Sequence, residues 1–208
     1  MKKIILTFVT ICGFTIANAQ IKTDAGTFTK PSAGSYQVEL SFSPNIAGAS
    51  SSMFSLPNFY GSNIPGIRVR KFSSETKAMR FTGNVSASNS GETGAETDFT
   101  VALGVGVENH MKGAERLSTY WGYEGNVGYQ STSTPADLTN PASKETILGV
   151  SAQVFTGFDY YIMPNIYLGC EVNYGVAILN TKPDGGDGTT SFKVQPNVLP
   201  AFRLGWRF

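Results

Sequence analysis

Apolar and polar residues alternate one by one along most of the chain after residue 35. The clearest example is 99–107, where Phe, Val and Leu at odd positions alternate with Thr, Ala and Gly at even ones. A period of two is the signature of a β-strand whose two faces meet different surroundings. The pattern predicts eight strands in all, at 35–46, 66–72, 78–87, 99–107, 119–130, 148–160, 166–178 and 192–208.

The connections between the predicted strands alternate in length. Those at 47–63, 88–97, 131–145 and 180–191 are long and rich in Ser, Thr, Gly, Asn and Pro, whereas 73–77 and 161–165 are short and 108–117 is intermediate. Outer-membrane barrels keep short turns on the periplasmic side and long loops outside, and have an even number of strands. We therefore predict an all-β fold, an eight-stranded antiparallel up-and-down transmembrane β-barrel with both termini in the periplasm.

A soluble β-sandwich or a lipocalin is the alternative, because its strands also alternate. Two features favour the membrane barrel. The apolar faces carry Tyr, Trp and Phe near the strand ends, as in aromatic girdles. The opposite faces carry Gly, Asn, Gln, Glu and Arg, which suit the lumen of a small barrel better than the core of a sandwich.

The N-terminus has the organisation of a secretory signal peptide. Two lysines at positions 2–3 precede the apolar stretch 4–16, and Ala-Asn-Ala at 17–19 is a cleavage motif. The apolar stretch is shorter than the roughly 20 residues that a membrane-spanning helix needs. We predict that residues 1–19 are cleaved and that 20–208 form one barrel domain.

Composition narrows the classes of partner. The formal net charge is +1, and charged residues make up 15% of the chain. There is thus no basic field for nucleic acid, and no nucleic-acid partner is expected. After cleavage of the signal peptide, Cys170 is the one remaining cysteine, so no intramolecular disulfide is expected.

The C-terminal end carries the most specific motif. Large apolar residues alternate with Ala, Arg and Gly up to a terminal aromatic residue, at Phe202, Leu204, Trp206 and Phe208. This pattern resembles the C-terminal assembly signal of outer-membrane barrels, which the barrel-insertion machinery recognises. An alternating strand at a chain end suits recognition by strand addition. The resemblance implies the insertion machinery as a partner through the last strand.

A second motif is 157–169, Gly-Phe-Asp-Tyr-Tyr-Ile-Met-Pro-Asn-Ile-Tyr-Leu-Gly. It resembles the strand–turn–strand of the OmpA/OmpX-like small outer-membrane β-barrel superfamily, with Pro-Asn at 164–165 in the tight periplasmic turn. Tyr160, Tyr161 and Tyr167 fit that membrane interface. The resemblance implies a Gram-negative outer membrane and contact with its lipid. It implies little about function, since small barrels host adhesins, lipid enzymes and scaffolds alike.

The polar faces of the predicted strands carry charges of both signs. The predicted lumen charge network consists of Glu39, Glu124, Asp159, Glu171, Arg68, Arg70, Arg80, Arg203 and Arg207, while Val101, Leu103, Val105, Val172 and Val176 are expected to face lipid. An eight-stranded barrel is just wide enough to be filled by side chains. Unpaired buried charge is costly, so we expect an ion-paired plug. A narrow polar passage is the alternative.

Catalysis and metal binding have little support. His110 is the one histidine of the chain and falls in a predicted periplasmic connection, where we expect a solvated turn residue. Outer-membrane lipid enzymes with a serine and a histidine work at the outer leaflet, so no catalytic site is predicted. Asp184 and Asp187 could hold calcium, but their spacing is not that of a calcium loop. No metal and no cofactor are expected.

The first long connection is unusually apolar. It carries Met53, Phe54, Leu56, Phe59 and Tyr60. Exposed apolar surface of this size covers or binds something, so this first extracellular loop either caps the barrel or docks on another envelope protein. The expected function is that of a non-enzymatic outer-membrane barrel with a structural or interaction role, such as a subunit of a larger envelope complex. A small passive pore and an outer-leaflet lipid-modifying enzyme are the alternatives.

Overall fold

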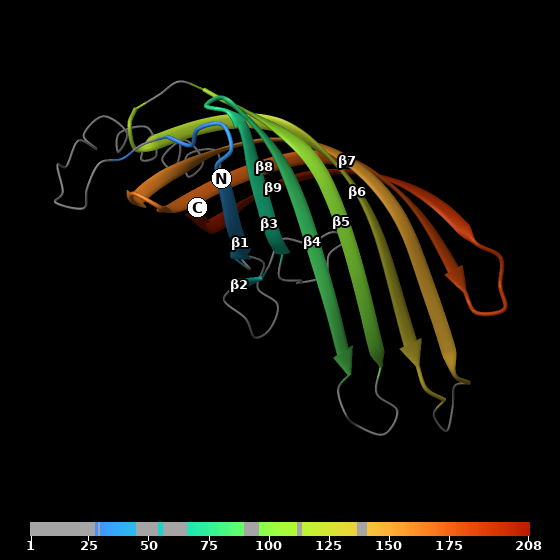
Figure 1. The fold of residues 1–208 in the computed structure, drawn as a ribbon. Helices are drawn as coiled ribbons and strands as arrows, with labels where there is room; N and C mark the ends of the chain where they lie inside the picture. The colour runs from blue at the N-terminus through green and yellow to red at the C-terminus, as the bar shows by residue number, and fades with distance from the viewer. Residues whose placement is uncertain are drawn as a thin grey trace, which may run out of the picture.

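The computed structural model is one antiparallel sheet that curls until its first and last long strands meet (Figure 1). Its strands are β1 (Tyr36–Pro44), β2 (Phe54–Ser55), β3 (Gly66–Ser74), β4 (Lys77–Asn89), β5 (Thr97–His110), β6 (Leu117–Thr134), β7 (Ser143–Met163), β8 (Ile166–Pro183) and β9 (Thr189–Arg207). The structure describes residues 28, 30–44, 54–55, 66–89, 96–111, 114–136 and 141–208, without the side chains of 42–44, 54–55 and 195–201. Within these ranges no helix has the length and apolarity to span a membrane.

The eight longer strands form a closed ring. Consecutive strands pair in the order β1, β3, β4 and so on to β9, and β9 pairs back onto β1. Six residue pairs make this seam, from Gln37 with Arg207 to Phe42 with Phe202. The two-residue strand β2 pairs only with the end of β1 and lies outside the ring. The predicted eight-stranded antiparallel barrel is confirmed, with β2 as an addition that the alternation did not show.

The start of β1 and the C-terminal end of β9 lie at the end of the barrel that carries the short turns (Figure 1). The amide of Arg207 donates to the carbonyl of Asn165 in the β7–β8 turn, and the amide of Phe208 donates to the carbonyl of Tyr36. The β3–β4 turn is two residues long, at 75–76. Because short turns mark the periplasmic side, this is the periplasmic end.

Several strands run further than the alternation predicts. β7 has 21 residues and β6 and β8 have 18 each, whereas about 9–11 residues cross a bilayer at a tilt. The additional length is polar, since Ser131–Thr134 of β6 pairs with Ser143–Thr146 of β7. Alternation reports lipid on one face and lumen on the other, but backbone pairing continues into water. The predicted loop 131–145 therefore shortens to 135–142.

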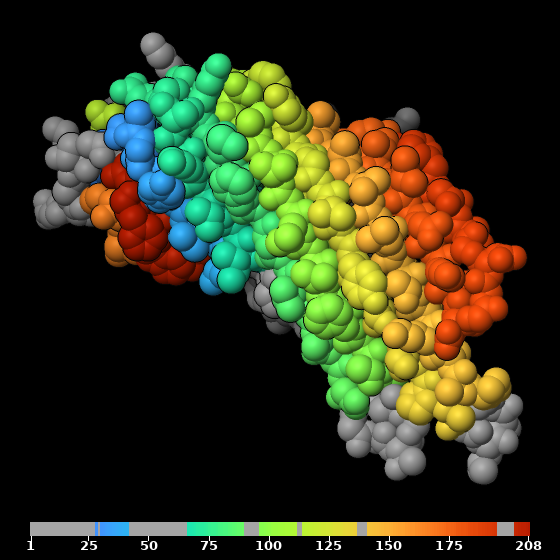
Figure 2. Space-filling view, turned by 45° about the vertical axis from the view of Figure 1, so that its right-hand side comes forward, coloured from blue at the N-terminus to red at the C-terminus, as the bar shows by residue number. Residues whose placement is uncertain are grey.

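Side chains on the strands follow the predicted alternation of inward and outward positions. On β5, Leu103 is 61% exposed and the adjacent Ala102 is 3% exposed. The outward residues include the valines and the leucine expected to face lipid: Val101, Leu103, Val105, Val172 and Val176. In the space-filling view, the described part of the outer wall is continuous from β3 to β8 (Figure 2).

Charged side chains on the outward face are confined to the two ends of the wall. Within the described strands they are all lysines: Lys71 and Lys77 at the periplasmic end, and Lys144 and Lys182 at the other. The outward positions between these ends are apolar or uncharged. Lys71 and Lys77 border the apolar band directly and place their ammonium groups at the lipid headgroups, whereas Lys144 and Lys182 lie on the polar extension beyond it. The band between them marks the membrane-spanning part.

Glycine is required where aromatic rings enter the lumen. A Cβ on Gly205 would collide with the ring of Tyr167, and a Cβ on Gly157 would collide with Tyr120. Both tyrosine rings are fully buried. The interior of an eight-stranded barrel is just large enough for side chains, so the bare backbone of one strand makes the space for the ring from its neighbour.

The outward direction of Leu103 can be tested by placing a charge there. Leu103→Arg should lower the free energy of unfolding in lipid vesicles by roughly 2–4 kcal/mol, the cost of arginine near the bilayer midplane. Ser133→Arg is the matched control, because Ser133 also points outward but lies on the polar extension of β6. Equal stability of the two variants in denaturant titrations would show that the band is misplaced.

The seam between β1 and β9 depends on the last residue. The amide and the carbonyl of Phe208 both bond to Tyr36, so deletion of Phe208 removes the final step of closure. We expect slower insertion into the outer membrane with normal export to the periplasm. Pulse-chase measurement of the heat-modifiable folded form checks this, with deletion variants compared to Phe208→Tyr, which keeps the ring and the backbone. Wild-type folding of the deletion variant would contradict the prediction.

Candidate functional site

The charged side chains of the lumen form the main candidate site. The structure buries eight of the nine residues of the predicted network, each with at most 8% of its surface exposed: Glu39, Arg68, Arg70, Arg80, Glu124, Asp159, Glu171 and Arg203. With Glu108, which lies beyond the predicted end of its strand, every strand of the ring contributes at least one charge. The site therefore gathers residues that are up to 164 positions apart in the chain.

One half of the network is a ring of two arginines and two carboxylates. Arg70 pairs through Nε with Glu39 and through Nη2 with Asp159 at 2.8 Å. Arg203 contacts the same two carboxylates, Glu39 at 3.0 Å and Asp159 at 2.8 Å. Asp159 is thus shared by two guanidinium groups and Glu39 by three, because Arg68 also lies 3.7 Å from Glu39. Sharing of this kind offsets the cost of removing four charges from water.

The other half is centred on Arg80 and Glu171. Arg80 pairs with Glu124 through Nε and with Glu171 through Nη1 at 3.0 Å. Arg68 donates to both carboxylate oxygens of Glu171 at 3.3 Å, which is the bidentate geometry that arginine favours.

Glu108 joins the two halves. Its two carboxylate oxygens contact Arg70 at 3.0 Å and Arg80 at 3.4 Å. A second link runs from Arg203 to Glu171 at 3.6 Å. The ion pairs are consequently continuous across the lumen from the wall at β1 and β9 to the wall at β4 and β6.

Aromatic rings fill the space around the charges. The hydroxyl of Tyr120 donates to Glu171 at 3.0 Å. The guanidinium of Arg80 lies 3.5 Å from the centre of the Phe155 ring, and that of Arg70 lies 5.1 Å from the centre of the Tyr167 ring. These are cation–π distances. Rings and guanidinium groups together form a layer packed across the barrel.

The structure corrects the prediction for His110. It is not a solvated turn residue, because β5 extends to it and only 6% of its surface is exposed. Its ring contacts Ser118 Oγ through Nδ1 at 2.9 Å and Glu108 through Nε2 at 3.1 Å. The signal was present in the chain: Glu108 and His110 continue the even, inward-facing positions of β5. Ending the strand at residue 107, where the apolar residues stop, hid both of them.

Ser118, His110 and Glu108 have the composition of a hydrolase triad, but their surroundings do not suit one. Ser118 is 3% exposed and its neighbours are equally buried, so an acyl substrate has no surface beside the hydroxyl. Glu108 also binds two arginines, which already compensate its charge. A working triad needs the nucleophile to be accessible to a substrate. The three residues are better explained as a packed hydrogen-bonded chain.

The periplasmic mouth holds two tyrosines that were predicted to lie at the membrane interface. Tyr161 and Tyr167 are instead inside, with 2% and 0% of their surface exposed, whereas Tyr160 has the outward direction. The amide of Gln37 donates to the hydroxyl of Tyr161 at 2.8 Å. Arg207 also lies at this mouth, half-buried, 3.3 Å from Asn165 Oδ1. Arg207 is therefore outside the buried lumen charge network of which it is a predicted member.

The remaining predicted residues lie elsewhere. The alternating residues of the assembly signal, Phe202, Leu204, Trp206 and Phe208, point outward at or beside the seam. Asp184 and Asp187 lie in the exposed turn after β8, and no group of three or more His, Cys, Asp or Glu suited to a metal occurs among the described residues. The predicted signal peptide 1–19 and the side chains of Met53, Phe54, Leu56, Phe59 and Tyr60 fall outside the described part.

A closed ring with an apolar outer band and a charged, filled lumen defines a transmembrane β-barrel. The family model described as "Putative OmpA-OmpF-like porin family" matches residues 82–208, more than half of the chain. The chain therefore belongs to this family and is an outer-membrane β-barrel protein. It has no significant match among curated proteins.

Several solved outer-membrane proteins are similar in structure at low sequence identity. The attachment invasion locus protein Ail of Yersinia pestis is 12% identical with a TM-score of 0.46, covering 85% of this chain and 99% of Ail. A major outer membrane protein of Thermus thermophilus is 14% identical with a TM-score of 0.47, covering 85% and 100%. The N-terminal β-barrel domain of Pseudomonas aeruginosa OprF is 10% identical with a TM-score of 0.41, covering 86% and 100%.

Removal of Arg80 should expose the importance of the charge layer. Arg80→Leu removes the arginine that pairs with Glu124 and one of the three that contact Glu171, which should lower the free energy of unfolding by about 3–5 kcal/mol. Arg207→Leu at the mouth is the matched control and should cost less than about 1 kcal/mol. Tryptophan-monitored urea titration in lipid vesicles measures both. The charge layer would be irrelevant to stability if the two substitutions had the same effect.

Proposed function

We propose that this protein is a non-enzymatic, non-conducting barrel with a structural or interaction role in the outer membrane. The observation that carries the proposal is the continuous layer of buried ion pairs across the lumen. Five carboxylates face four arginines there, a difference of one charge, and His110 contacts one of the carboxylates. Charges that already compensate one another leave little electrostatic free-energy gain for binding a passing ion.

A small passive pore is the second candidate, because the family description contains the word porin. An ion that crosses the lumen would have to separate pairs such as Arg70 with Asp159 and Arg80 with Glu171. Breaking a buried pair costs several kcal/mol, and both guanidinium groups also lie against aromatic rings. The packing therefore favours a closed lumen over an open one.

An interaction role is supported by the length of β6, β7 and β8, which extend beyond the apolar band on the side opposite the short turns. β6, β7 and β8 continue well beyond the lengths of β1 and β3, which have nine residues each. This extension carries hydroxyl and amide side chains in Ser131–Thr134 and Asn180–Thr181, and charged ones at Lys144, Glu145 and Lys182. A rigid, hydrated sheet above the lipid presents many hydrogen-bonding groups at low entropic cost. A second interaction surface stays a prediction from the sequence. It is the first extracellular loop, which would bind an envelope protein through Met53, Phe54, Leu56, Phe59 and Tyr60.

Single-channel recording tests the closed lumen. The wild-type protein in planar bilayers should show no discrete conductance steps at neutral pH. Arg80→Ala combined with Glu171→Ala removes two opposite charges and the centre of the layer, and this variant should conduct. A protein of known pore size, inserted under the same conditions, controls for incorporation. If the wild-type protein shows stable conductance of the same size as the variant, the closed lumen is contradicted and the protein is a pore.

A further inference from the structure

Two lysines of the outer wall lie close together at the periplasmic end. Lys71 on β3 and Lys77 on β4 both point outward. Their strands are joined by the two-residue turn at 75–76, and Lys71 is paired in register with Met79, two positions along β4 from Lys77. Outward side chains two positions apart on adjacent strands are close neighbours. This end of the wall therefore carries a local positive charge on its lipid side.

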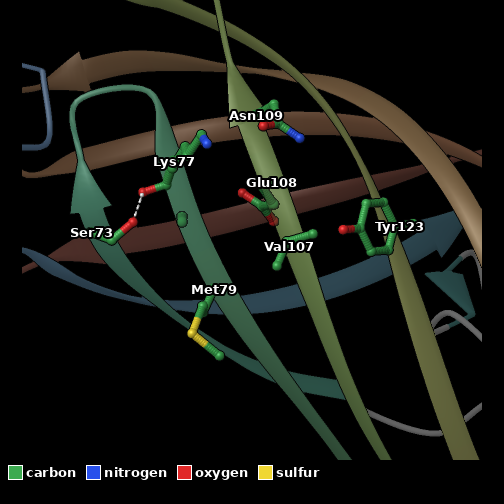
Figure 3. Close-up of a pocket in the computed structure, with 8 residues that line it drawn as sticks. Ser73, Lys77, Met79, Val107, Glu108, Asn109 and Tyr123 are labelled. Carbon is green, nitrogen blue, oxygen red and sulfur yellow. Dashed lines mark hydrogen bonds between the residues drawn. The ribbon is translucent and has the colours of Figure 1, made fainter.

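A shallow depression of about 200 Å³ lies beside Lys77 (Figure 3). Its outward side chains come from the end of β3, the start of β4, the end of β5 and β6: Ser73, Lys77, Met79, Val107, Asn109 and Tyr123. Register explains the grouping, because Lys77 pairs with Asn109, and Met79 pairs with Val107, which pairs with Tyr123. The polar ends thus lie toward the turn and the apolar side chains toward the middle of the wall.

Neither lysine is neutralised by a carboxylate among the described residues. Glu108 borders the depression through its backbone, but its carboxylate points inward to Arg70 and Arg80. Glu75 in the turn interacts with Lys30. Lys71 Nζ lies 5.5 Å from the centre of the Tyr36 ring, which leaves its charge intact. The depression combines a cationic and amide-bearing edge with an apolar floor.

We propose that this depression binds an anionic phospholipid of the periplasmic leaflet. The phosphate lies at the ammonium group of Lys77 and accepts a hydrogen bond from the Asn109 amide. Lys71, which lies outside the depression with its ammonium group over the Tyr36 ring, adds positive charge nearby. An acyl chain lies along Met79 and Val107. The site is at the height of the headgroups, since the outward positions beyond Lys77 toward the middle of the wall are apolar. Basic residues at a membrane surface attract anionic lipid by about 1 kcal/mol each, roughly fivefold in affinity.

The chain contains a natural reporter for this site. Trp121 on β6 is paired in register with Asn109, points outward and is half exposed. The sequence has two tryptophans, and the second, Trp206, lies on β9. A Trp206→Phe background therefore leaves fluorescence from Trp121 alone. The two lysines at the other end of the wall, Lys144 and Lys182, provide a matched charge control.

The experiment compares brominated phosphatidylglycerol with brominated phosphatidylcholine, each at the same small mole fraction in phosphatidylcholine vesicles. Bromine placed near the headgroup quenches tryptophan on contact. We expect stronger quenching of Trp121 by the brominated anionic lipid than by the brominated zwitterionic one. Lys71→Gln with Lys77→Gln should abolish the difference, with a loss of roughly fivefold in relative affinity per lysine. Lys77→Arg should retain most of it, and Lys144→Gln with Lys182→Gln should leave it unchanged.

Three results would overturn the proposal. Equal quenching by the two lipids in the parent protein would show that the site does not select anionic lipid. A preference that survives Lys71→Gln with Lys77→Gln, or that falls equally in the control pair, would assign it to the general charge of the protein. Absence of quenching by either lipid would show that lipid does not occupy the depression beside Trp121 and that a second copy of the protein covers it. Heat-modifiable migration of each variant verifies that it is folded.

Discussion

The constraint on which the structure depends is that lipid offers no hydrogen-bonding partner to the backbone. A sheet that crosses the membrane must therefore close, because an edge in the hydrocarbon would leave its amides and carbonyls unpaired. In this chain the closing edge is short: six residue pairs join β1 to β9, and Phe208 extends the seam by its bonds to Tyr36. The alternation of the sequence follows from the same constraint, since each strand of a closed ring has one lipid face and one lumen face.

Closure in turn determines what the lumen can be. Eight strands enclose a space that side chains fill, and every strand of this ring directs at least one charged side chain into it. Charges brought together in this way must compensate one another. The ion pair of Glu39 with Arg203 lies across the same two strands that form the seam, and Arg70 with Asp159 joins β3 to β7. The charge layer and the ring are thus interdependent: opening the seam would separate pairs, and separating pairs would loosen the seam.

How much of this the sequence predicts depends on the range of each signal. The number of strands, their antiparallel order and the direction of residues such as Leu103 and Arg80 follow from a local period of two, and the structure agrees with them. The ends of the strands do not follow, because alternation stops where lipid stops, while hydrogen bonding continues. For this reason the predicted strand ends at residue 107, and Glu108 and His110, which belong to β5, fall outside it. Tyr161 and Tyr167 were placed at the interface because tyrosine is common there, whereas the small Gly205 on the adjacent strand makes room for Tyr167 inside.

A barrel arranged in this way restricts where function can reside. The arginines and carboxylates of the lumen are bound to one another, and the middle of the outer wall is apolar and faces acyl chains. The surfaces left for specific recognition are the rims, where the wall meets the headgroups, and the hydrated part of the sheet above the membrane. The chain distributes its outward charges accordingly, because within the described strands they are four lysines, two at the periplasmic rim and two on the hydrated part of the sheet. Lysine at a rim is compatible with lipid because its stem is apolar and its ammonium group reaches the phosphates. Lys71 and Lys77, at the periplasmic rim, are therefore the outward charges best placed to contact lipid phosphates.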